Sequence, residues 1–156
     1  PGNVVLRSDV DLATVSMMTD LADVPFMRLA LVEARRGLGN VSPNPAVGAV
    51  LVQRGCVLAS GYHRGVGLPH AEIECLAAAP AGSLRSATLY VTLEPCSTTG
   101  RTPPCTAAIV RAKVGRVVVG TGECRRAIAG ARLGEVAGRG RIITWKPALA
   151  GPSPSP

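Results

Sequence analysis

The order of the regular elements constrains the fold of this chain more than any other feature of its sequence. Residues 46–63 are typical of a β-hairpin, because two apolar runs flank the turn sequence QRG. The patterns that follow predict a helix over residues 70–79, a strand over 87–93, a helix over 103–113, a strand over 115–120, a weaker helix over 127–138 and a last strand over 141–145. A hairpin followed by alternating helices and strands predicts an α/β fold in which helices cover both faces of a mixed sheet.

A further helix is expected before the hairpin. Apolar residues recur at helical spacing over residues 24–37. Asp23 or Val24 is expected to start this helix, and Gly37 is expected to end it.

The two ends of the chain lack such patterns. Residues 1–20 show no clear period and are expected to form a mobile tail. Residues 148–156 are rich in proline and serine and are expected to be disordered. One domain over residues 21–147 is left between them. A hydrophobic content of 47% and a charged content of 17% suit a globular domain with a substantial core.

The composition narrows the class of function. The net charge of +7 is compatible with nucleic acid or with small anionic substrates. One Phe, two Tyr and one Trp are too few for a platform that stacks the bases of a single strand, so the composition argues against a nucleic-acid partner. No apolar run is long enough to span a bilayer and no secretion signal opens the chain, so we expect a cytoplasmic protein without a membrane partner. The odd number of cysteines, 5, indicates a reducing compartment and a metal-binding or catalytic use of some thiols.

One nitrogen ligand and two sulfur ligands stand out in the sequence. His70, Cys96 and Cys105 form a donor set that suits Zn²⁺, and a catalytic zinc site uses three protein ligands with one position left open. Cys105 lies in the first turn of a predicted helix, whose positive end favours a thiolate. Glu72 follows His70 by two residues, so its carboxylate can move a proton between water at the metal and a leaving amine. His-x-Glu followed by Pro-Cys and a later Cys is typical of zinc nucleobase deaminases.

Less specific interpretations remain for these residues. A single histidine on a helix is more often structural, and a closed zinc site would need a fourth ligand, for which Cys75 is the nearby candidate. Cys75 lies along an alanine-rich helix and is expected to be a small core residue. The segment STTGRTPP between Cys96 and Cys105 is also longer than the Cys-x-x-Cys spacing of nucleic-acid deaminases and cytidine deaminases.

Four sequence motifs resemble one enzyme family. They are SPNPAVGAVLV, GYHRGVGLPHAE, LYVTLEPCSTTGRTPPC and VGRVVVGTGE. From about Phe26 to Trp145, the chain is similar to the deaminase domain of the bifunctional riboflavin biosynthesis deaminases/reductases. This resemblance implies a cytidine deaminase-like fold, a three-layer αβα sandwich with a mixed five-stranded sheet.

The resemblance also implies a reaction. The zinc ligands of the family match His70, Cys96 and Cys105, and its proton shuttle matches Glu72. The reaction is the zinc-dependent hydrolytic deamination of 2,5-diamino-6-ribosylamino-4(3H)-pyrimidinone 5′-phosphate, so the expected partner is this small-molecule substrate.

Residues for substrate binding follow from the same resemblance. Asn44 and His63 match residues of the pyrimidine pocket, although without the family His63 would be interpreted as a structural histidine at a strand end. Arg101 and Thr102 match the loop that holds the ribose phosphate. This role suits a guanidinium, which forks onto phosphate oxygens, and a hydroxyl near a helix start.

The chain departs from the family after residues 115–120. The family has Asp-Pro-Asn-Pro where this chain has ECRR, so Glu123 and Arg125 replace groups that touch the sugar of the substrate. Arg125 or Arg126 is expected either to supply a second phosphate contact or to lie in an exposed basic turn. Thr98 stands where the family often has His. The reductase half is absent, which predicts a stand-alone deaminase or a piece cut from a longer protein.

Two other functions stay open. A deaminase of another nucleobase, nucleoside or nucleic acid is favoured by the ECRR segment and by the positive charge. A zinc-stabilised interaction module without activity would require a fourth protein ligand on the metal. Deaminases of this fold usually associate, so a homodimer or a larger homo-oligomer is expected by analogy.

Overall fold

The computed structural model describes residues 12–82, 84–97, 103–121 and 141–144. The elements are α1 (Leu12–Arg35), β1 (Gly48–Gln53), β2 (Cys56–Tyr62), α2 (Ala71–Ala77), β3 (Ala87–Leu93), α3 (Cys105–Ala112), β4 (Arg116–Thr121) and β5 (Arg141–Thr144). The strands form one sheet in the order β2-β1-β3-β4-β5. Strand β1 is antiparallel to β2 and β3, whereas β3 and β4, and β4 and β5, are parallel. The predicted α/β fold with a mixed sheet is confirmed, and the helix expected over residues 127–138 lies outside the described residues.

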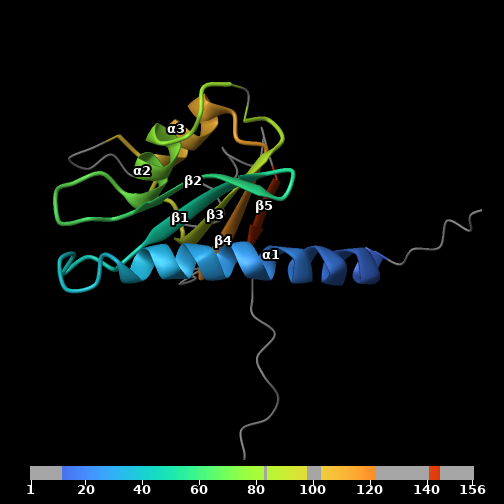
Figure 1. Cartoon of the computed structure of the whole chain (residues 1–156), viewed down its shortest axis with the longest axis horizontal. Helices are drawn as coiled ribbons and strands as arrows, with labels where there is room; N and C mark the ends of the chain where they lie inside the picture. The colour runs from blue at the N-terminus through green and yellow to red at the C-terminus, as the bar shows by residue number, and fades with distance from the viewer. Residues whose placement is uncertain (1–11, 83, 98–102, 122–140, 145–156) are drawn as a thin grey trace, which may run out of the picture.

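Helices cover both faces of the sheet. Helix α1 lies along one face, and α2 and α3 lie on the other (Figure 1). The cluster under α1 consists of Met27, Ala30, Val50, Val52, Tyr90 and Val118. The larger cluster under α2 and α3 includes Leu51, Cys75, Leu89, Val91, Ile109 and Val117. Because side chains alternate along a strand, β1, β3 and β4 each contribute to both clusters.

The predicted hairpin is confirmed as β1 and β2. Arg54 and Gly55 form its turn with φ angles of 52° and 78°. Two successive residues with positive φ are the geometry of tight hairpin turns, whose twist matches that of the strands. The hairpin places β2 at one edge of the sheet, with α2 packed against it.

Gly61 in β2 allows α2 to approach the sheet closely. A Cβ atom at this position would lie 2.5 Å from the backbone nitrogen of Cys75 and 2.8 Å from the carbonyl oxygen of Ala71. Both contacts are with backbone atoms, so a larger residue would push the helix away. The position of α2 therefore depends on a glycine in the neighbouring strand.

Helix α1 begins earlier than its sequence pattern predicts. It starts at Leu12 rather than at Asp23 or Val24, so residues 12–20 of the expected tail are helical. Pro25 lies inside α1, although proline is common in the first turn of a helix. No helix in the described ranges is both long enough and apolar enough to cross a membrane.

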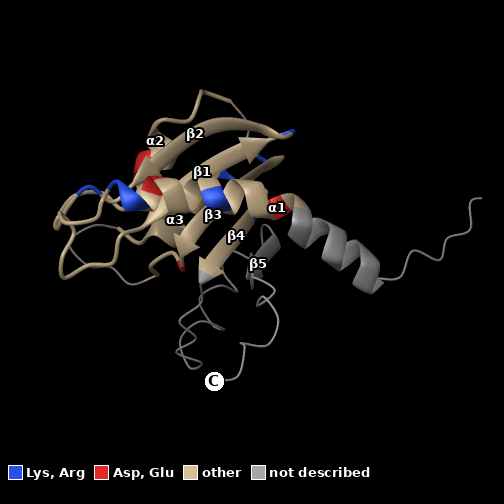
Figure 2. Ribbon diagram, turned by 60° about the horizontal axis from the view of Figure 1, so that its bottom comes forward, with Lys and Arg blue, Asp and Glu red and all other residues tan. Residues whose placement is uncertain are grey.

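Asp23 holds α1 to the sheet instead of capping it. Its carboxylate is 2% exposed and accepts hydrogen bonds from the Tyr90 hydroxyl at 2.8 Å and from both terminal nitrogens of Arg116, one of them at 2.7 Å. Burial and the neighbouring carboxylate raise the pKa of Tyr90. The strands of the sheet are otherwise almost free of charged residues, which gather on helices and loops (Figure 2). Asp23, which the local pattern assigned to a helix start, thus forms a tertiary ion pair with Arg116 instead.

Replacing Asp23 by Asn is expected to lower the free energy of unfolding by about 3 kcal/mol, because the guanidinium of Arg116 would lose its counter-ion in a partly buried position. Tyr90→Phe should cost about 1 kcal/mol, the worth of one hydrogen bond. Urea denaturation followed by circular dichroism measures both. Glu33→Gln is the control, because it breaks only the ion pair with the exposed Arg36. An equal loss in this control would contradict the role given to Asp23.

Candidate active site

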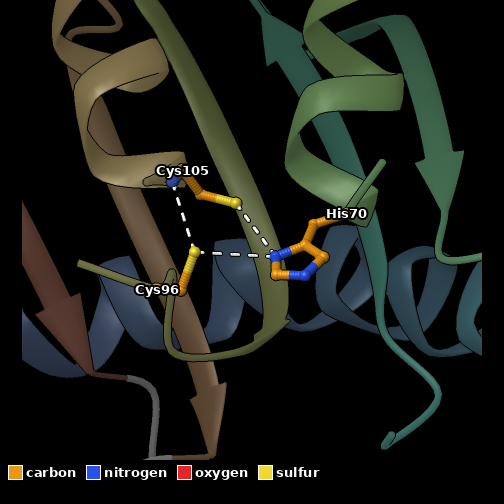
Figure 3. A group of neighbouring side chains, drawn as sticks. All are labelled: His70, Cys96 and Cys105. Atoms are coloured by element: carbon orange, nitrogen blue, oxygen red, sulfur yellow. Dashed lines mark hydrogen bonds between the residues drawn. The ribbon is translucent and has the colours of Figure 1, made fainter. Parts of the chain in front are cut away.

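Three potential metal ligands meet where β3 ends and two helices begin. His70 is the residue before the first turn of α2, Cys96 follows the end of β3, and Cys105 is the first residue of α3. Their side chains point toward one another (Figure 3). The Nδ1 atom of His70 lies 3.6 Å from Cys96 Sγ and 3.3 Å from Cys105 Sγ, and all three ligand atoms lie within 4.8 Å of one another.

These spacings fit a tetrahedral zinc ion. With Zn–N and Zn–S bonds of about 2.0 and 2.3 Å, two tetrahedral ligands lie about 3.5 Å apart. The observed distances from His70 to the two sulfur atoms are close to this value. Within the described part of the chain, no fourth residue joins the group. Three protein ligands of these types are the donor set of catalytic zinc sites.

The start of α3 stabilises Cys96. The backbone N–H of Cys105 donates to Cys96 Sγ at 3.3 Å, and the backbone N–H of Thr106 donates to the Cys96 carbonyl at 3.2 Å. The hydrogen bond from the Cys105 thiol, followed by that from the Cys105 backbone and the charge of His70, lowers the pKa of Cys96 to about 5. The same shared proton raises the pKa of Cys105. A metal cation in place of this proton would let both groups be thiolates.

Glu72 lies beside this group in the first turn of α2. It is 3% exposed, and burial raises its pKa, while a backbone hydrogen bond, His70 and Cys105 partly oppose the rise. A carboxyl group with a raised pKa can both accept and return a proton near neutral pH. Its position and its environment suit a general acid and base.

A cavity of about 200 Å³ opens beside these residues. The described residues that line it are Asn44, Pro45, Val47, His63, His70, Glu72, Leu93, Glu94 and Cys96. Apolar side chains and a few polar groups in one small hollow are typical of a site for a small planar molecule. The cavity is smaller than pockets for drug-sized ligands, which span roughly 300–1,000 Å³.

The structure brings together most of the predicted site residues. His70, Cys96 and Cys105 form the metal-ligand group, and Glu72, Asn44 and His63 line the cavity beside it. The predicted substrate residues Arg101, Thr102, Glu123 and Arg125 lie outside the described residues, as does Thr98.

The prediction that Cys75 is a core residue is confirmed, whereas the position of Glu94 at the cavity was not predicted. Cys75 is fully buried in the core under α2, with its sulfur 3.6 Å from the Ala59 carbonyl, so it is not a ligand. Glu94 lines the cavity but was missed by sequence reasoning. Its position directly after β3 and before Pro-Cys was the available signal, because side chains at strand ends often line binding sites.

The fold and the metal-ligand group define a zinc-binding deaminase domain. Residues 22–121 match the family of the cytidine and deoxycytidylate deaminase zinc-binding region, and the chain belongs to this family. Within it, the chain matches the deaminase domain of riboflavin biosynthesis proteins: RibD of Aquifex aeolicus is 52% identical over 99 residues. The solved diaminohydroxyphosphoribosylaminopyrimidine deaminase/5-amino-6-(5-phosphoribosylamino)uracil reductase of Thermotoga maritima is 40% identical, with a TM-score of 0.73. A structure from a study of tRNA:A34 deaminases is 32% identical, with a TM-score of 0.56.

The matches differ in how much of each protein they cover. They include 64% of this chain and 28% of the Aquifex protein, and 81% of this chain and 37% of the Thermotoga chain. The tRNA deaminase match covers 78% of this chain and 97% of that structure. The chain thus spans a minor part of the length of the riboflavin biosynthesis proteins it matches.

We expect the purified protein to bind about one Zn²⁺ per chain and Cys105→Ser to bind less than about a tenth of this amount, because the loss of one of three ligands removes most of the affinity. Elemental analysis after dialysis measures the zinc content. Cys56→Ser is the matched control, since Cys56 is exposed on the hairpin. Full zinc content in Cys105→Ser would rule out this ligand set.

Proposed function

We propose that this domain catalyses the zinc-dependent hydrolytic deamination of 2,5-diamino-6-ribosylamino-4(3H)-pyrimidinone 5′-phosphate, a step of riboflavin biosynthesis. The observation that carries the proposal is the buried carboxyl group of Glu72 beside three zinc-type ligands, at a cavity of about 200 Å³. The names of the Aquifex and Thermotoga relatives support the choice of substrate. The proposal concerns deamination alone.

Glu72 has the central role in the chemistry. When bound, Zn²⁺ would supply Lewis acidity that makes water a nucleophile at neutral pH. Glu72 takes a proton from the attacking water as the new C–O bond forms, and it delivers this proton to the adjacent ring nitrogen. It then carries the second proton of the same water to the exocyclic amine, so that the C–N bond breaks and ammonia leaves. In sum, the substrate and one water are converted to the oxo product and ammonia.

The environment of Glu72 suits these two transfers. Burial raises its pKa, which favours the protonated form that can give a proton to the leaving amine. A backbone hydrogen bond, His70 and Cys105 oppose this rise and favour the carboxylate form that can take a proton from water. A fully exposed carboxylate at the same place would be a weaker acid catalyst for the departure of the amine.

Other residues of the chain would bind the substrate. Asn44 and His63 line the cavity and are proposed to orient the pyrimidine ring. Arg101 and Thr102 are proposed to hold the phosphate, and Glu123 and Arg125 are proposed to contact the ribose phosphate where the family has other residues. By analogy with deaminases of this fold, we also propose that the protein forms a homodimer or a larger homo-oligomer.

A deaminase of another base, nucleoside or nucleic acid is the second candidate. The likeness to the tRNA:A34 deaminase structure favours it, since the match covers nearly all of that chain. An ammonia-release assay separates the two candidates when it is run on the riboflavin-pathway pyrimidine phosphate, cytosine, cytidine, guanine and single-stranded DNA. Release from the pyrimidine phosphate alone is expected. Preferred release from any other member of the panel would refute the proposed substrate.

Glu72→Gln is expected to lower kcat for ammonia release by about a thousandfold, because the amide cannot move protons. Its zinc content should stay unchanged, since Glu72 is not a ligand. Glu74→Gln is the matched control on the same helix, where the carboxylate pairs with Arg64 at 3.3 Å near the surface. Native turnover in Glu72→Gln would show that another group moves the protons.

A further inference from the structure

His63 connects a cavity residue to a metal ligand. It directly follows β2 and is 3% exposed. Its Nε2 atom lies 3.3 Å from Asn44 Nδ2, and its Nδ1 atom lies 3.1 Å from the carbonyl oxygen of Pro69, the residue before His70. The rings of His63 and His70 meet edge to face with centroids 5.4 Å apart. Both nitrogens of the His63 ring are therefore engaged, each on a different side.

The two partners assign the ring proton of His63. A carbonyl oxygen only accepts, so Nδ1 carries the proton and donates to Pro69. The amide nitrogen of Asn44 only donates, so Nε2 accepts from it. The two assignments are consistent with a single tautomer, and they give the chain of hydrogen bonds one direction, from Asn44 through His63 to Pro69.

This series of hydrogen bonds fixes the orientation of the Asn44 amide. If its nitrogen is used by His63, the carbonyl oxygen of Asn44 is left as the free acceptor of that side chain at the cavity, where the described residues provide no other partner for it. A rotated amide would place two acceptors, Asn44 Oδ1 and His63 Nε2, against each other. The oriented amide thus recognises a ligand that presents an N–H group, such as a ring imide or an exocyclic amine.

The same ring restrains the metal ligand. Pro69 O is fixed by His63 immediately before the chain turns into α2 at His70. The edge-to-face contact limits the rotation of the His70 ring, whose Nδ1 faces the two sulfur atoms. Partners that orient a ligating histidine commonly raise the affinity of a metal site by about 10- to 100-fold.

We propose that His63 is a positioning residue with two separable effects, the orientation of Asn44 toward N–H donors of the substrate and the restraint of His70 for the metal. The substrate half rests on the proposed function, whereas the metal half does not. His63 acts through these neighbours and need not touch the reacting atoms.

Two variants separate the effects because each retains one half of the imidazole. In His63→Gln, the amide oxygen replaces the Nε2 acceptor for Asn44, but the donor to Pro69 is lost. In His63→Asn, the amide nitrogen replaces the Nδ1 donor to Pro69, but the shorter side chain does not reach Asn44. We expect His63→Gln to bind zinc about tenfold more weakly in competition with a chelator, with KM within about threefold of the native value. We expect His63→Asn to bind zinc normally and to raise KM about tenfold.

Further variants serve as controls for this test. His63→Ala should show both losses, and with Asn44→Ala already present, His63→Asn should change KM by less than about twofold. Asn44 is exposed, so its replacement leaves the fold intact and gives a result even if a His63 variant misfolds. Equal losses in His63→Gln and His63→Asn, or no loss in either, would overturn the proposal. If the native domain deaminates another substrate, the proposed function fails, while the chelator competition still decides the metal half.

Discussion

The hydrogen bond from the Cys105 backbone to Cys96 Sγ is the contact on which the site depends. It joins the start of α3 to the segment that follows β3. A second hydrogen bond, from the Thr106 N–H to the Cys96 carbonyl, joins the same two segments. Because β3 and β4 are parallel, the helix that connects them must begin at the carboxyl end of β3. The first turn of α3 thus supplies both a potential metal ligand, Cys105, and the N–H group that stabilises the Cys96 thiolate.

The second helix completes this arrangement from the opposite direction. Helix α2 packs on β2 at Gly61, so that His70, directly before the helix, and Glu72, in its first turn, lie at the same place. His70 can reach the sulfur atoms only because α2 lies this close to the sheet. Because His70 and Glu72 lie at the same end of α2, any shift of this helix would move the potential metal ligand and the proposed proton carrier together.

Charge is arranged differently on the two faces of the sheet. Under α1, a carboxylate is fully paired by Arg116 and Tyr90, which makes it a structural element of the core. On the other side, the buried carboxyl group of Glu72 forms no ion pair with a Lys or Arg among the described residues, and burial raises its pKa. A paired carboxylate stabilises the fold, whereas one with a raised pKa is available for proton transfer.

The sequence by itself determined the order of the described elements, the mixed sheet and which three potential metal ligands meet beside Glu72. Each of these follows from local patterns: apolar periodicity, turn residues, and ligands at the starts of helices and the end of a strand. It did not determine the start of α1, because Asp23 and Pro25 have a local preference for a helix start that the pairing of Asp23 with Arg116 overrides. Nor could it show that Glu94 lines the cavity, or that His63 joins Asn44 to Pro69. Those relations depend on distances between segments far apart in the chain, and only the packing of α1, α2 and α3 on the sheet decides them.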